Sequence, residues 1–179
     1  MVKSDKQVME GLFSASNEAL QTAKKKWEEV DAIFFCEGPG STLGLRIACA
    51  FIRTIQWSNR SNLRLFRYNA LDMANLLCNS PASIQAPFRR GFRFVRTGEE
   101  PIGRIEIFKT EEAGQLFPDS MHLPDPRNSQ EEIPPDKKIC YHLGDQIKNV
   151  REMLAICQEC DEAIPYSPRP PEFKKWVPQ

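Results

Sequence analysis

Hydrophobic positions in the first eighty residues alternate between helical and strand-like spacing. Apolar residues recur every three to four positions over residues 6–27 and 42–57, which is the period of an amphipathic helix. Short apolar runs at 30–35 and 63–68 are typical of buried strands, and a further helical stretch covers 70–78. We therefore expect the order helix, strand, helix, strand, helix, with the two strands parallel and buried.

The pattern becomes less regular beyond residue 80, where a loop over residues 80–87 predicts a boundary between two lobes. The segments expected after it are strands of a hairpin over 88–95 and 102–108, an irregular loop over 118–135, a strand over 138–143 and a helix over 146–157. This predicts a first lobe over residues 1–80, a second lobe over 81–164, and a proline-rich tail over 165–179 that is extended against the surface or disordered.

The composition is that of a globular protein, with 41% hydrophobic and 27% charged residues in a chain of 179. No apolar run is long enough to span a membrane, and no apolar signal segment follows residues 1–6, so we expect a cytoplasmic protein without membrane contact. In that compartment, the six cysteines are expected to be reduced thiols and not a disulfide framework.

Charge is unevenly distributed although the net charge is zero. Nine arginines and one acid, Asp72, lie between residues 38 and 98, whereas residues 99–136 hold ten acids and three bases. Such asymmetry indicates either a basic face that meets phosphate or an acidic partner, or two stretches that neutralise each other across the fold.

A glycine-rich turn over residues 38–47 connects the first predicted strand to the second predicted helix. Backbone N–H groups of Gly38, Gly40 and Ser41 at a helix start could cradle a phosphate, although the run matches neither common nucleotide-binding pattern. The alternative is a plain tight turn in which Gly44 lets the helix pack closely on the sheet. Arg46 opposes the helix macrodipole in the first turn, so we expect it to have an acidic partner within the chain or across an interface.

The run Gly38-Pro39-Gly40-Ser41-Thr42-Leu43-Gly44-Leu45-Arg46-Ile47 resembles the signature of the TsaB (YeaZ) family, and residues 31–33 and 69–74 resemble its flanking segments. The resemblance extends over about residues 8–77. It implies an actin-like ATPase (ASKHA-type) α/β fold with a second, small α+β lobe. The strands that precede the first helix in that family are missing from this sequence. We therefore expect a lone strand pair with a bare edge, which favours dimerisation, partner binding or marginal stability.

The same resemblance implies a non-catalytic scaffold or activator of a TsaD-type enzyme during formation of threonylcarbamoyladenosine at position 37 of tRNA. It implies a TsaD-type paralog as partner, with a TsaE-type ATPase in the same pathway, a second copy of the chain as an alternative partner, and tRNA engaged indirectly. It implies no catalytic residue, cofactor or metal of its own.

The first two predicted helices are the expected docking surface, because they carry more apolar surface than one thin sheet needs. The residues assigned to partner binding are Met9, Phe13, Arg46, Phe51, Ile55 and Trp57. The alternative, that these side chains face the sheet, is favoured for Phe51 and stays open for Met9, Phe13 and Trp57. A basic face is further expected to contact tRNA through Arg60, Arg64, Arg67 and Arg89.

Two rival sites remain. Cys140, His142, Cys157 and Cys160 offer four zinc-type ligands, although ordinary scaffold positions are the favoured interpretation. Residues 90–95 resemble the RNP1 motif of RNA-recognition domains, in which Phe92 and Phe94 would stack on bases. The alternative is a hairpin strand that buries both rings. An independent RNA-binding module and a degenerate remnant without function are thus the competing functional interpretations.

Overall fold

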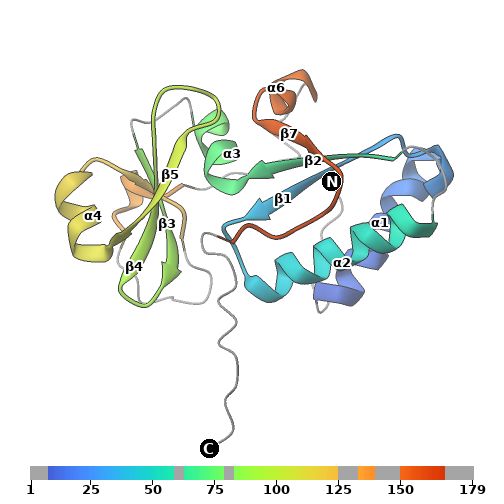
Figure 1. The fold of residues 1–179 in the computed structure, drawn as a ribbon, viewed down its shortest axis with the longest axis horizontal. Helices are drawn as coiled ribbons and strands as arrows, with labels where there is room; N and C mark the ends of the chain where they lie inside the picture. The colour runs from blue at the N-terminus through green and yellow to red at the C-terminus, as the bar shows by residue number, and fades with distance from the viewer. Residues whose placement is uncertain (1–7, 59–62, 79–82, 125–132, 140–149, 168–179) are drawn as a thin grey trace, which may run out of the picture.

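The computed structural model describes residues 8–58, 63–78, 83–124, 133–139 and 150–167 (Figure 1). Within these ranges the chain forms two β-sheets and five α-helices, so the mixed α/β class expected from the sequence is confirmed. Helix α3 (Ala70–Leu77) lies where the two sheets meet. No helix in the described ranges is both long and apolar enough to cross a membrane.

The first sheet has the strand order β1-β2-β7. Strands β1 (Ala32–Gly38) and β2 (Arg64–Asn69) are parallel, and β7 (Cys157–Cys160) pairs with β2 in the antiparallel direction. The helices α1 (Val8–Ala23) and α2 (Thr42–Ser58) pack against each other, and α2 covers one face of this sheet. The predicted order of helices and strands is confirmed, with a short 3-10 helix, η1 (Trp27–Glu29), preceding β1.

Strand β7 corrects two expectations. It gives the first sheet a third strand where the sequence predicted a lone pair. It also returns residues 157–160 to the first sheet, so residues 81–164 do not form one continuous lobe in space. The helix expected over 146–157 is wrong at its end, because α6 (Val150–Leu154) stops before β7 begins.

The second sheet has the order β5-β4-β3-β6. Its strands are β3 (Ser83–Arg89), β4 (Phe92–Thr97), β5 (Arg104–Lys109) and β6 (Met121–His122), and helix α4 (Thr110–Leu116) follows β5. The predicted hairpin of β4 and β5 is confirmed. The strand predicted over 88–95 is wrong, because the chain reverses at Gly91 (φ 77°) and β3 lies where a loop was expected.

Only the start of the strand predicted over 138–143 is described. Lys138 forms an isolated parallel bridge with His122, just after the 3-10 helix η2 (Pro135–Lys137). Residues 140–143 lie outside the described ranges.

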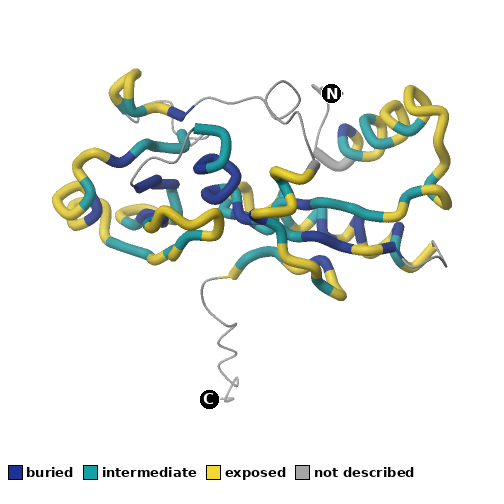
Figure 2. Tube along the Cα trace, turned by 90° about the horizontal axis from the view of Figure 1, so that it is seen from above, coloured by how far each residue is buried: buried dark blue, intermediate teal, exposed yellow. Residues whose placement is uncertain are grey.

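Each sheet has its own hydrophobic core, and Figure 2 shows the buried positions gathered in the strands and in α3. The first core includes Phe35, Phe51, Ile52, Ile55, Leu65 and Ala163, and the second includes Leu71, Ala74, Ile84, Phe94 and Ile139. The segment of residues 161–167, here called the strap, runs from β7 to the tip of β1. It contributes Ala163 to the first core and Tyr166 to the second, so it connects the two.

Candidate functional site

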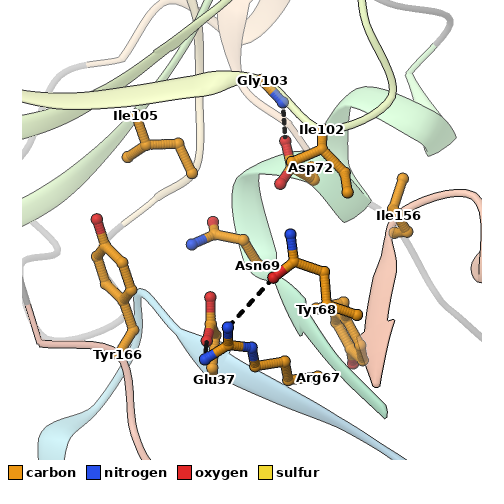
Figure 3. A pocket seen from close by; sticks show the side chains of 11 residues that line it. Glu37, Arg67, Tyr68, Asn69, Asp72, Ile102, Gly103, Ile105, Ile156 and Tyr166 are labelled. Atoms are coloured by element: carbon orange, nitrogen blue, oxygen red, sulfur yellow. Dashed lines mark hydrogen bonds and ion pairs between the residues drawn. The ribbon is translucent and has the colours of Figure 1, made fainter. Parts of the chain in front are cut away.

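A crevice of about 230 Å³ lies at the carboxyl ends of the parallel strands β1 and β2 (Figure 3). This is the position where open α/β sheets bind their ligands, because the chain diverges there and leaves a gap above the strand ends. We call it the polar crevice. Its polar lining residues are Glu37, Arg67, Asn69, Asp72, Gln158 and Tyr166, and its apolar ones include Ile102, Ile105 and Ile156.

Glu37 and Arg67 place opposite charges at one end of the polar crevice. The distance between Arg67 Nη1 and Glu37 Oε2 is 3.6 Å, so the groups attract each other but are too far apart for a hydrogen bond. Arg67 Nη2 donates a hydrogen bond to Gln158 Oε1 at 3.2 Å. Burial raises the pKa of Glu37, and the nearby Arg67 guanidinium only partly offsets that rise.

Asn69 connects the end of β2 to the start of α3. Its extended backbone and side-chain Oδ1, which accepts a hydrogen bond from Leu71 N at 2.9 Å, make it the N-cap of α3. Asn69 is only 5% exposed, and its Nδ2 has no hydrogen-bond acceptor among the described residues. Its Nδ2 still lies close enough to the Glu37 carboxylate to offset part of the rise that burial causes in the pKa of Glu37. A buried amide donor is thus left available beside the crevice.

Asp72 and Arg96 form a buried ion pair that shapes the opposite wall. Asp72 Oδ1 accepts hydrogen bonds from Arg96 Nε at 2.7 Å and from Gly103 N at 2.9 Å. The Arg96 side chain is fully buried. Its remaining donors bond to backbone carbonyls of the loop between β4 and β5, those of Gly98, Glu100 and Pro101. The pair therefore holds this loop against α3.

The glycine turn lines a second pocket of about 200 Å³, and Tyr166 is shared by both pockets. Gly38 has a φ of 136°, and a Cβ there would lie 3.3 Å from Cβ of Tyr166. The closely packed glycine is therefore Gly38, because a Cβ at Gly44 would meet only Ser41 at ordinary contact distance. The expectation that Gly44 is needed for close packing is wrong. Gly40 lines the pocket, and Ser41 Oγ accepts a hydrogen bond from Gly44 N at 3.4 Å.

The residues assigned to partner binding separate into two groups. Phe51 and Ile55 are 7% and 8% exposed and belong to the first core, so their assignment to a docking surface is wrong. Phe13 is 44% exposed and packs edge-on against Phe51, and Trp57 is 88% exposed. The side chain of Met9 lies outside the described part of the structure.

Arg46 is exposed at the rim of the glycine-turn pocket. No ion pair joins it to another residue within the described ranges, so the acidic partner expected for it is not found there.

Acids neutralise several of the arginines, but these acids do not come from the acidic stretch over 99–136. The observed pairs are Arg53–Glu162, Arg64–Glu159, Arg67–Glu37 and Arg96–Asp72. Arg64 and Arg67 are three positions apart on β2 and thus lie on opposite faces of the sheet. The expected basic face is therefore not continuous there.

Two further arginines belonged to the expected basic face. Arg89 lies over the ring of Phe92, with its Cζ 4.4 Å from the ring centroid. Arg60 lies outside the described ranges, and its contact with tRNA stays a prediction.

The zinc hypothesis finds no support in the residues that the structure describes, which contain no cluster of three or more metal ligands. Cys157 and Cys160 are three positions apart in the extended strand β7 and point to opposite faces of the sheet, so they cannot chelate one ion. Burial raises the pKa of the Cys157 thiol to about 11, which favours the protonated form. Cys140 and His142 lie outside the described ranges.

The RNP1-like strand does not present two rings to solvent. Phe94 is 4% exposed and packs in the second core against Phe88, with ring centroids 4.7 Å apart. Phe92 is half-buried beneath Arg89. Because base stacking needs exposed rings, the interpretation of this segment as a hairpin strand is the one that the structure supports.

The sequence interpretation missed most of the polar crevice. It assigned Arg67, and named Asn69 only within a segment that resembles a family. An asparagine directly before a helical stretch is a typical N-cap, and this signal could have located Asn69 at the end of β2. No local sequence signal could have predicted that Gln158 and Tyr166 line the crevice. Gln158 reaches it through the pairing of β7 with β2, and Tyr166 reaches it through the strap.

Comparison with known proteins finds a family match over part of the chain and two partly similar solved structures. The family model of TsaD, tRNA N6-adenosine threonylcarbamoyltransferase, matches residues 3–64, roughly a third of the chain. Among solved structures, YeaZ from Pseudomonas aeruginosa is 18% identical with a TM-score of 0.43, over 55% of this chain and 48% of that one. A structure of an uncharacterized protein with similarity to peptidase YeaZ from Pseudomonas aeruginosa is 19% identical with a TM-score of 0.44. The match covers 56% of this chain and 50% of that one.

The chain spans about half the length of these solved structures. None of the curated proteins matches it. The TsaD model covers α1, β1, the glycine turn and α2, which are the elements that carry the sequence signature. Over residues 3–64 the chain is therefore similar to the TsaD family, and the glycine-turn signature lies within that matched segment.

Proposed function

We propose that the chain acts as a TsaB-like partner of a TsaD-type enzyme in the formation of N6-threonylcarbamoyladenosine in tRNA, without chemistry of its own. The family match over residues 3–64 carries this proposal, because it falls on the segment that would form the docking surface. In this proposal a TsaE-type ATPase acts in the same pathway, and tRNA is engaged through the enzyme.

The exposed face of α2 supports a docking role. Leu43, Arg46, Ala50 and Trp57 are all exposed, and their spacing of three, four and seven residues places them on one side of the helix. We call them the α2 stripe. Leu43 is 65% and Trp57 88% exposed. Large apolar side chains left in solvent at both ends of one helix face are typical of a surface that a partner covers.

The test is size-exclusion chromatography with light scattering, applied to the chain alone and mixed with the TsaD homologue of the same organism. We expect a stable one-to-one complex. The double variant Leu43→Ser, Trp57→Ser is expected to keep the unfolding midpoint of the parent and to lose the complex, because both side chains lie outside the core.

The matched control is Leu116→Ser, which removes a 57% exposed leucine from α4 of the other sheet and should leave the complex intact. A folded parent chain that never co-elutes with TsaD would overturn the proposed function. If the double variant still binds as the parent does, the docking surface is not the α2 stripe.

A further inference from the structure

The polar crevice contains a built hydrogen-bond donor without an acceptor. Asn69 is fixed in place because its Oδ1 caps α3, and this leaves Nδ2 at the crevice, near the Glu37 carboxylate but without a well-formed hydrogen bond in the described part of the chain. A buried amide donor that lacks a well-formed hydrogen bond destabilises the fold, so such groups are typical of places where a ligand satisfies them. A ligand oxygen at this position would complete the hydrogen bonding of Asn69.

The charges around that donor are balanced. Figure 3 shows the side chains of Glu37, Arg67 and Asn69 directed toward the same space. Asp72 is already neutralised by Arg96, which leaves one carboxylate, Glu37, and one guanidinium, Arg67, to face a ligand. Their separation of 3.6 Å leaves hydrogen-bonding capacity on both groups. A phosphate with two negative charges suits such a site poorly, because Glu37 would repel it.

The remaining wall is apolar. Ile102, Ile105 and Ile156 line it, and Ile102 is 43% exposed, which is unusual for an isoleucine that faces a concave surface. The crevice volume of about 230 Å³ equals the space of roughly seven or eight waters at about 30 Å³ each. This is room for a small metabolite.

We propose that the polar crevice binds a free α-amino acid with an apolar side chain. Its carboxylate accepts hydrogen bonds from Arg67 and Asn69 Nδ2, its ammonium group donates to Glu37, and its side chain covers Ile102. The inference does not rest on the docking role proposed above, because the crevice and the α2 stripe share no residue.

The test is isothermal titration calorimetry with four probes on the full chain. L-Leucine is expected to bind with saturation at millimolar concentrations. L-Leucinamide lacks the carboxylate and N-acetyl-L-leucine lacks the ammonium group, so each is expected to bind at least tenfold more weakly. ADP is the fourth probe and is expected to give no saturable heat.

Three variants assign the contacts to residues. Asn69→Asp keeps the oxygen that caps α3 but replaces the amide donor by an acceptor, so it should lose L-leucine binding while α3 stays capped. Glu37→Gln should weaken the binding of L-leucine at least tenfold. Arg64→Gln is the control, because Arg64 lies on the same strand as Arg67 but outside the crevice. The affinity of this variant for L-leucine should match that of the parent.

Circular dichroism of each variant separates lost binding from lost folding. If Asn69→Asp does not fold, Arg67→Gln replaces it, since Arg67 is 43% exposed and contributes little to the core. The proposal is overturned if folded parent protein shows no saturable heat with L-leucine, if L-leucinamide binds equally well, or if ADP binds in its place.

Discussion

Gly103 stands where a side chain has no room. A Cβ built there would lie 2.6 Å from Cζ and Nε of Arg96, and Arg96 cannot move aside because Asp72 and three backbone carbonyls hold its guanidinium. We expect Gly103→Ala to lower the free energy of unfolding by about 2–4 kcal/mol, from overpacking and from the disturbed buried pair. Urea unfolding followed by circular dichroism measures it.

The matched control is Gly114→Ala in α4, where a Cβ would meet no atom within 4 Å. It should be neutral or raise the stability by up to about 1 kcal/mol, because alanine is the better helix former. Equal stability of the two variants would show that Arg96 is not rigidly held.

Glu37 should make the stability of the protein depend on pH. Its side chain is 16% exposed, and burial raises its pKa above the ordinary value of 4.5. Between that value and the raised one, the folded state binds more protons than the unfolded state, so stability falls as pH rises through this window. We expect Glu37→Gln to be more stable than the parent at pH 7, with the advantage vanishing below pH 4.5. Urea unfolding of both proteins between pH 4.5 and pH 7 measures this difference in stability.

Glu159→Gln should behave in the opposite way. The hydrogen bonds from Arg64 lower the pKa of Glu159, so its stabilising contribution is present at neutral pH and is lost on acidification. The variant is expected to be less stable than the parent at pH 7 and equal to it in acid. A difference between Glu37→Gln and the parent that stays constant with pH would contradict the assignment to Glu37.

Helices and strands with a clear apolar period could be predicted from the sequence almost to the residue. The sequence placed the second helix at 42–57 and the second strand at 63–68, close to the observed α2 and β2. The strand β3 was missed because Gln85 and Pro87 interrupt its apolar pattern. Gln85 is nonetheless buried, since its amide donates to Ala113 O and Ser120 Oγ. Tertiary hydrogen bonds here override a local signal.

Strand β7 shows the other limit of prediction. Its four residues, Cys-Gln-Glu-Cys, carry no strand period, and they become a strand only because β2 offers them a free edge. The polar crevice depends on the same long-range contact, which brings Gln158 beside Arg67. The fold class was therefore readable from local patterns, whereas most of the crevice was not.

The Asp72–Arg96 pair fixes α3 to the second sheet, since Asp72 belongs to α3 and Arg96 to β4. We expect Asp72→Ala to cost about 3–5 kcal/mol, because it leaves a fully buried guanidinium without its counter-charge. Thermal and urea unfolding measure the loss.

The control is Glu162→Gln, which breaks the exposed pair with Arg53 and should cost at most about 1 kcal/mol. If Asp72→Ala proves as mild as this control, the apolar contacts of α3 suffice to hold it to the second sheet.

The strap also bears on how the protein matures in the cell. Ala163 completes the first core and Tyr166 the second, while β7 closes the first sheet from about ninety residues away along the chain. Neither half can reach its final packing before these residues have emerged from the ribosome. The nascent chain must therefore stay partly open until residues 157–166 have been synthesised, which gives chaperones time to bind it and makes products that terminate earlier targets for proteolysis.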